Sequence, residues 1–102
     1  VKPDRKNNKR LEAEFRQATK PLRKSIEQHE KTMTAAQTKL EALEQQLGDT
    51  ELYNAENKTR LKQVLTEQAN HKSTLEEAEM YWLDAQEELE IKQKEFELEN
   101  VS

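Results

Sequence analysis

The chain contains no cysteine, a single glycine and only two prolines among its 102 residues. The lack of cysteine excludes disulfide bonds and metal sites built on thiolates. The longest apolar run covers only residues 80–83, which is far too short to cross a bilayer. The chain also begins without a methionine or an apolar leader segment. We therefore expect a soluble, intracellular segment that is taken from a longer protein.

Apolar residues are scarce as well: 32% of the chain is hydrophobic, whereas 37% is charged. Such a chain cannot fill a deep core, so it is either disordered or a long helix with one narrow apolar stripe. Its abundant Glu, Lys, Gln, Leu and Ala lose little side-chain freedom in a helix. Composition thus favours helix, and the spacing of the apolar residues decides the question.

That spacing predicts a coiled coil, in which apolar residues recur every 3.5 positions on average. Two consecutive steps of four, centred on Leu22, predict a local unwinding of the supercoil. Pro21 lies there, and we expect it to kink the helix because it cannot donate a backbone hydrogen bond. The predicted seam of the first helix consists of Leu11, Phe15, Ala18, Leu22, Ile26, His29, Met33, Ala36, Leu40, Leu43 and Leu47.

A second series keeps strict steps of three and four. It consists of Leu61, Val64, Gln68, His71, Leu75, Ala78, Trp82, Ala85, Leu89, Lys92 and Phe96. Between the two series, Gly48 is expected to end the first helix in a left-handed conformation. Asp49 is expected to cap a short turn, and Asn54 is expected to cap the second helix.

The sequence therefore predicts an all-α fold, an antiparallel two-helix coiled-coil hairpin with a short tip loop and a kink near Pro21. The expected parts are a flexible basic linker (1–8), a helix (9–47), a tip (48–54), a helix (55–98) and a frayed tail (99–102). A fold point near residue 52 would place Leu43 opposite Leu61 and Phe15 opposite Leu89. Because the heptad phase is kept across the break, one continuous helix in a parallel dimer is the alternative. It would place Thr50, Asn54 and Asn57 consecutively in the seam and a glycine in the middle of a helix, and both features disfavour it.

Charge is distributed unevenly. Residues 1–24 carry a net charge of +6 and residues 76–99 a net charge of −8, within a total of −4. In a hairpin these stretches would lie side by side, and their attraction would favour the antiparallel arrangement. A functional interpretation is a basic face that neutralises phosphates of a nucleic acid. The candidate nucleic-acid-binding residues are Lys9, Arg10, Arg16, Lys20, Arg23 and Lys24.

No phosphate-binding glycine loop, nucleophile elbow or zinc motif is present in the sequence, so we expect no catalytic residues and no metal ligands. His29 and His71 fall on the two seams, where they either approach each other or serve as polar register residues, as Gln68 does. Phe15 and Trp82 are in phase with the leucines and are expected in the core. Leu52 and Tyr53 at the tip either pack on the last helical turns or form a partner-binding tip.

Three stretches together resemble the C-terminal coiled-coil domain of ABC-F ATPases, over residues 9–90. They read QATKPLRKSIEQHEKTM, KLEALEQQLGDTELY and KSTLEEAEMYWLDAQEELE. The features that carry the resemblance are the LE-rich first helix, Pro21, the tip with Asp49, Leu52 and Tyr53, and Trp82.

The resemblance implies a cytoplasmic ATPase whose two ATP-binding cassettes lie upstream of this chain and would use ATP and Mg²⁺. Family members act on ribosomes, and in Uup-like members the corresponding hairpin is associated with DNA binding. The implied partners are the ribosome and its RNA or DNA, together with the cassettes of the same chain. No membrane contact is expected, and we expect the domain itself to be a non-enzymatic monomer without a cofactor. The alternative function is a structural or protein-binding coiled coil that touches no nucleic acid.

Overall fold

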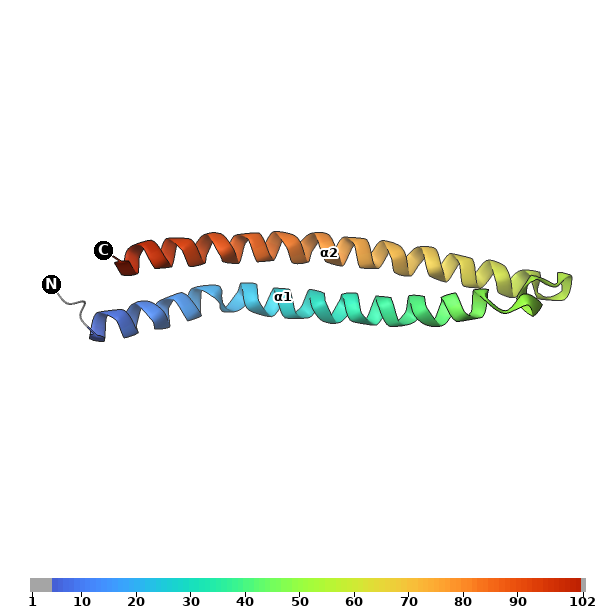
Figure 1. The fold of residues 1–102 in the computed structure, drawn as a ribbon, viewed down its shortest axis with the longest axis horizontal. Coiled ribbons are helices and arrows are strands. Elements are labelled where there is room, and N and C mark those ends of the chain that lie inside the picture. The colour runs from blue at the N-terminus through green and yellow to red at the C-terminus, as the bar shows by residue number, and fades with distance from the viewer. Residues whose placement is uncertain (1–4, 102) are drawn as a thin grey trace. The chain divides into compact units, whose positions relative to one another are not determined.

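The computed structural model describes residues 5–101, which form two long helices and a short connection (Figure 1). Helix α1 spans Arg5–Leu47, and helix α2 spans Lys58–Val101. The connection contains two short 3₁₀ helices, η1 (Thr50–Tyr53) and η2 (Ala55–Asn57). The predicted all-α helical hairpin is therefore confirmed. None of the helices in the described part of the chain is long and apolar enough to cross a membrane.

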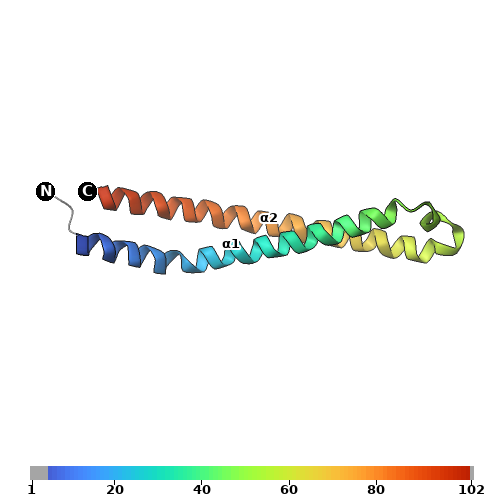
Figure 2. The same cartoon turned by 60° about the horizontal axis from the view of Figure 1, so that its bottom comes forward.

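Close contacts divide the chain into two units, each of which contains a part of α1 and a part of α2. The tip unit is His29–Tyr81 and includes the connection. The terminal unit consists of the described residues up to Gln28 and from Trp82 onward. Within each unit the two helical segments run alongside each other (Figure 1), and in the second view their ribbons cross within the tip unit (Figure 2).

The buried residues follow the predicted seams closely. In the tip unit Ala36, Leu43, Val64 and Ala78 are at most 4% exposed. In the terminal unit Ile26 and Ala85 are buried. All eleven predicted seam residues of α2, from Leu61 to Phe96, are buried or half-buried. The 3–4 spacing therefore located the packed face of α2 correctly.

One seam position of α1 differs from the prediction. Ala18 is exposed, whereas Thr19 is only 1% exposed. The Thr19 hydroxyl donates a hydrogen bond of 2.8 Å to the carbonyl oxygen of Phe15, so burying this hydroxyl leaves no polar atom without a partner. The two consecutive steps of four therefore run from Leu11 through Phe15 to Thr19, not through Leu22.

Pro21 lies inside α1, which continues to Leu47. Proline cannot donate to the carbonyl four residues earlier, which belongs to Gln17. The carbonyl of Arg16, the residue that precedes Gln17, accepts a 2.7 Å hydrogen bond from the guanidinium of Arg23. The ribbon of α1 bends in its light-blue part (Figure 2). A side chain thus supports the helix backbone next to the proline.

The connection differs from the prediction at both of its ends. Gly48 does not adopt a positive φ, and its N–H still bonds to the Glu44 carbonyl at 3.1 Å, as in a continuing helix. Asp49 caps η1 as predicted, since its carboxylate accepts from the Glu51 N–H at 3.0 Å. Asn54 precedes η2 and not α2, and its side chain makes no capping bond. Because η2 occupies residues 55–57, the second helix begins later than expected.

The outer boundaries also differ from those expected. α1 begins at Arg5, so residues 5–8 are helical where a linker was expected, and α2 continues to Val101 through the expected frayed tail. Residues 5–8 include Lys6 and Asn8 and no proline or glycine, so nothing in them stops the helix from extending. Residues 1–4 of the expected linker and residue 102 of the expected tail lie outside the described residues.

The pairing of the helices is shifted by one heptad in the terminal unit. Phe15 stacks on Phe96, with ring centroids 4.6 Å apart, and not on Leu89. In the tip unit Leu43, Leu52 and Val64 form the core, with Leu47 and Leu61 packed against it. The longer connection, with two 3₁₀ helices, moves the fold point toward α2, and this moves the partner of Phe15 along α2 by seven residues.

Candidate nucleic-acid interface

The six basic residues proposed for nucleic-acid contact all lie on α1 in the terminal unit, and all are exposed. At 100° per residue, Lys9, Arg16, Lys20 and Arg23 fall within about 60° of one another around the helix axis. We refer to these four residues as the basic stripe. Lys24 lies beside the basic stripe, and Arg10 lies farther around the helix. The helix therefore gathers four of the six charges on one exposed face, which flanks the buried seam.

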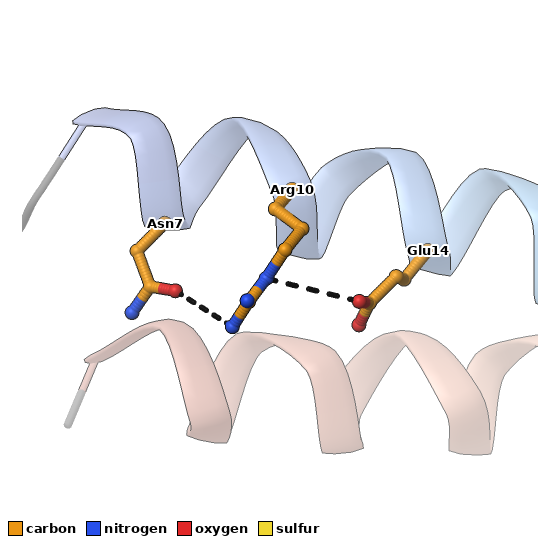
Figure 3. Close-up of polar contacts among 3 residues, drawn as sticks. All are labelled: Asn7, Arg10 and Glu14. Carbon is orange, nitrogen blue, oxygen red and sulfur yellow. Dashed lines mark hydrogen bonds and ion pairs between the residues drawn. The ribbon is translucent and has the colours of Figure 1, made fainter.

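Arg10 is engaged by neighbours on its own helix. Its guanidinium donates to the Asn7 side-chain oxygen at 3.0 Å and lies 3.8 Å from the Glu14 carboxylate (Figure 3). Both charged side chains are largely exposed, at 70% and 65%. An ion pair this exposed contributes at most about 1 kcal/mol, so a phosphate could replace Glu14 at little cost.

Arg16 and Arg23 are linked to each other. The Arg16 guanidinium lies 3.9 Å from Glu12, one turn earlier on α1. Arg23 donates to the Arg16 backbone carbonyl, which holds its guanidinium along the stripe. A guanidinium has five N–H donors, so Arg23 retains donors for a second acceptor such as a phosphate oxygen. Both arginines therefore contact groups of α1 and still remain exposed to solvent.

The three lysines of the set, Lys9, Lys20 and Lys24, are exposed and have no hydrogen-bond or ion-pair partner among the residues whose side chains the structure describes. An exposed ammonium group stays fully hydrated and available to a polyanion. These lysines supply the least compensated positive charge of the stripe.

Attraction between the basic and acidic stretches was the other interpretation of the charge pattern. The ion pairs Arg10–Glu14, Arg16–Glu12 and Lys94–Glu90 each join residues four positions apart on one helix. Such pairs support the individual helices by a few tenths of a kcal/mol. They use carboxylates of the same helix, and so they do not fix the pairing of α1 with α2.

The two tip residues have different environments. Leu52 is 8% exposed and belongs to the core with Leu43 and Val64, so it is not presented to a partner. Tyr53 is 58% exposed, and its hydroxyl donates to the Leu47 carbonyl at 2.7 Å. The bond ties an accessible aromatic ring to the end of α1. Partner binding at the tip stays a prediction, now for Tyr53 alone.

The structure does not bring the two histidines together. His29 stacks on Tyr81 with ring centroids 5.6 Å apart, whereas His71 lines a shallow groove with Lys39 and Leu43. Among the described residues, no three His, Cys, Asp or Glu side chains are grouped so that they could hold a metal ion. Gln68 and Trp82 are half-buried at their seam positions.

Sequence reasoning missed the contact between His29 and Tyr81. Tyr81 lies next to the seam residue Trp82, at a flanking position that a 3–4 count leaves out. Its proximity to a facing helix could have been inferred only once the register was known.

Comparison with known proteins gives one group of relatives. The chain is 51% identical over 86 residues to YheS of Escherichia coli K12 and to YheS of E. coli O6:H1, both named as probable ATP-binding proteins. YheS of Haemophilus influenzae is 55% identical over 42 residues, which are 41% of this chain.

No family model matches the chain, and no solved structure does. The 86 matched residues are 84% of this chain but only 14% of the E. coli proteins. The chain is therefore homologous to one segment of YheS, a probable ATP-binding protein.

Proposed function

We propose that this chain is the non-catalytic coiled-coil arm of a cytoplasmic ABC-F ATPase and that it contacts ribosomal RNA or DNA through α1. The contact residues are those of the basic set, Lys9, Arg10, Arg16, Lys20, Arg23 and Lys24. The names of the relatives support an ATP-binding parent protein. ATP and Mg²⁺ would act in the cassettes of that parent, and the arm would transmit their movement to the nucleic acid during ribosome or translation remodelling.

The observation that carries the proposal is the stripe itself. Four basic side chains share one exposed face of α1, and the ion pairs that Arg10 and Arg16 make are surface pairs on their own helix. Contacts with a phosphate backbone require many such charges in a row but no base-specific geometry. A helix face with basic residues at successive turns meets that requirement.

The test measures the affinity of the 102-residue chain for a duplex DNA and for a ribosomal RNA fragment across a range of salt concentrations. The logarithm of the association constant should fall linearly with the logarithm of salt concentration. Reversing two charges, with Arg16→Glu and Lys20→Glu, should abolish most binding. Replacing both residues by alanine should reduce the salt slope by about 1 for each phosphate that is no longer neutralised.

The matched control reverses two exposed lysines of the tip unit, Lys39→Glu and Lys58→Glu, and thus changes the net charge by the same amount. The control should bind with an affinity much closer to that of the unchanged chain. Equal losses in both double variants would show that only net charge matters, and the assignment of the site to α1 would fail.

A second candidate function is a protein-binding arm, which the exposed and anchored ring of Tyr53 favours. Aromatic residues with one end held in place lose little freedom on binding. The partner would be a cassette of the same chain or a ribosomal protein. Binding of this kind should persist at moderate salt and should be lost in Tyr53→Ala, whereas Arg16→Glu with Lys20→Glu should leave it intact.

A further inference from the structure

Helix α2 carries large apolar side chains outside its packed seam. In the tip unit, Leu65 is 48% exposed and lines a groove of about 540 Å³ together with Leu61 and Ala69. Lys58 and Lys62 form part of the same groove, and both are exposed. Four residues of this groove, Lys58, Leu61, Lys62 and Leu65, stand at positions i, i+3, i+4 and i+7, the arrangement that surrounds a hole for a side chain of another helix. We refer to this surface as the basic-edged groove.

In the terminal unit, α2 exposes a second set of apolar residues. Leu83, Ile91 and Leu98 are 53%, 58% and 73% exposed. Their spacing of eight and seven residues places them within about 80° of one another around the helix. The charged residues on and beside this line are four exposed carboxylates and one lysine, Lys94, which pairs with Glu90 of the same helix. The four carboxylates are those of Asp84, Glu87, Glu88 and Glu95. We refer to this surface as the acidic-edged stripe.

Apart from Leu61, which also packs against the core of the tip unit, the apolar residues of both surfaces lie outside the seam that pairs α1 with α2. Apolar side chains are scarce in this chain, at 32% of residues. Large apolar residues at repeated positions on a solvent-exposed face indicate a contact with another molecule. The charged residues at the edges of each surface indicate that its partner must carry charge of the opposite sign beside its apolar residues.

We propose that the basic-edged groove of one copy of this chain binds the acidic-edged stripe of a second copy. The two surfaces are complementary. The groove has apolar residues with positive charges at their edge, and the stripe has apolar residues with negative charges at their edge. The ammonium groups of Lys58 and Lys62 would meet carboxylates such as that of Glu87, while Leu83 or Ile91 would enter the hole around Leu65. Opposite charges at the edges of paired helices set partner choice and orientation.

The basic face of α1 is a poorer partner for the acidic-edged stripe. Its basic residues Lys9, Arg16, Lys20 and Arg23 are interspersed with small or polar side chains such as Ala13 and Gln17. That face could pair with carboxylates, but it would leave Leu83, Ile91 and Leu98 exposed. The basic-edged groove provides both charge and apolar surface, and every copy carries it.

Two narrow helix faces cover less area than a standard interface of about 1,600 Å², so the association is weak and depends on concentration. It departs from the monomer that the sequence suggested. It does not depend on nucleic-acid binding, which involves other residues on α1.

The test is sedimentation equilibrium of the 102-residue chain over a wide range of protein concentrations. The mass should rise from that of a monomer toward that of a larger species as concentration increases. Lys62→Glu in the groove and Glu87→Lys in the stripe should each lower the association constant by roughly tenfold, equivalent to about 1.4 kcal/mol. An equimolar mixture of the two variants should associate more strongly than either one alone, because the reversed charges then match across the contact.

Lys39→Glu is the matched control, since Lys39 is an exposed lysine on α1 in the same unit. It should associate as the unchanged chain does, and circular dichroism should show equal helix content in all variants. A chain that stays monomeric at every concentration would overturn the proposal. So would a mixture that recovers no association, because the groove and the stripe would then not face each other.

Discussion

At the scale of single residues, the fold depends on a few positions where α1 and α2 exclude water. Val64 is fully buried and packs with Leu43 and Leu52, whereas the next residue, Leu65, is 48% exposed. The sequence places two similar aliphatic residues side by side, and only the position relative to the seam separates their roles. Hydrophobicity alone would rank Leu65 equal to Val64.

Val64→Ala should therefore reduce the free energy of unfolding by about 2 kcal/mol, because methyl groups are removed from the core and a cavity remains. Leu65→Ala should change it by less than about 0.5 kcal/mol at low protein concentration. Urea unfolding followed by circular dichroism measures both values. Equal effects of the two substitutions would contradict the placement of the seam.

Thr19 shows what apolar patterning cannot predict at this scale. A count of hydrophobic residues selects Ala18 for the seam, yet the structure buries Thr19. The hydroxyl is satisfied by the backbone of its own helix, so threonine behaves there as a small, largely apolar residue. To identify such a residue, one must know how the helix is rotated about its own axis at that turn. The spacing of the neighbouring seam residues determines this rotation only as an average over several turns.

At the scale of elements, the spacing of seam residues predicts both helices and the packed face of α2. The connection was predicted less well, because its glycine was assumed to require a left-handed conformation. In the structure Gly48 has no positive φ, and the reversal of the chain is made by η1, η2 and the Asp49 cap. Hydrogen bonds from Tyr53 to Leu47 and from Asn57 to Glu51 hold the connection together.

Gly48→Ala should consequently be tolerated. An added Cβ would lie 3.4 Å from the Gln45 carbonyl oxygen and 3.7 Å from that of Glu44, which are ordinary contacts. Alanine restricts the unfolded chain more than glycine does, so we expect a gain of about 0.5 kcal/mol in unfolding free energy. Thermal unfolding of the two proteins compares them directly. A decrease of about 1 kcal/mol or more would indicate a left-handed residue at this position.

At the scale of the whole molecule, the sequence predicts that the chain reverses but not which residues meet. A heptad repeat looks the same after a shift of seven residues, so Leu89 and Phe96 are equivalent partners for Phe15 in the pattern. The length of the connection decides between them, and the 3₁₀ helix over residues 55–57 was not apparent from the spacing of apolar residues. The basic stripe is subject to no such ambiguity, since all its residues lie on one helix.

The most direct test of the hairpin and its register is a pair of engineered disulfides in this cysteine-free chain. One variant combines Phe15→Cys with Phe96→Cys, and the other combines Phe15→Cys with Leu89→Cys. Because Phe15 packs on Phe96 and not on Leu89, mild oxidation at low protein concentration should link the first pair within a single molecule much faster than the second pair. Efficient linkage of the second pair, or linkage only between molecules, would contradict the antiparallel pairing described above.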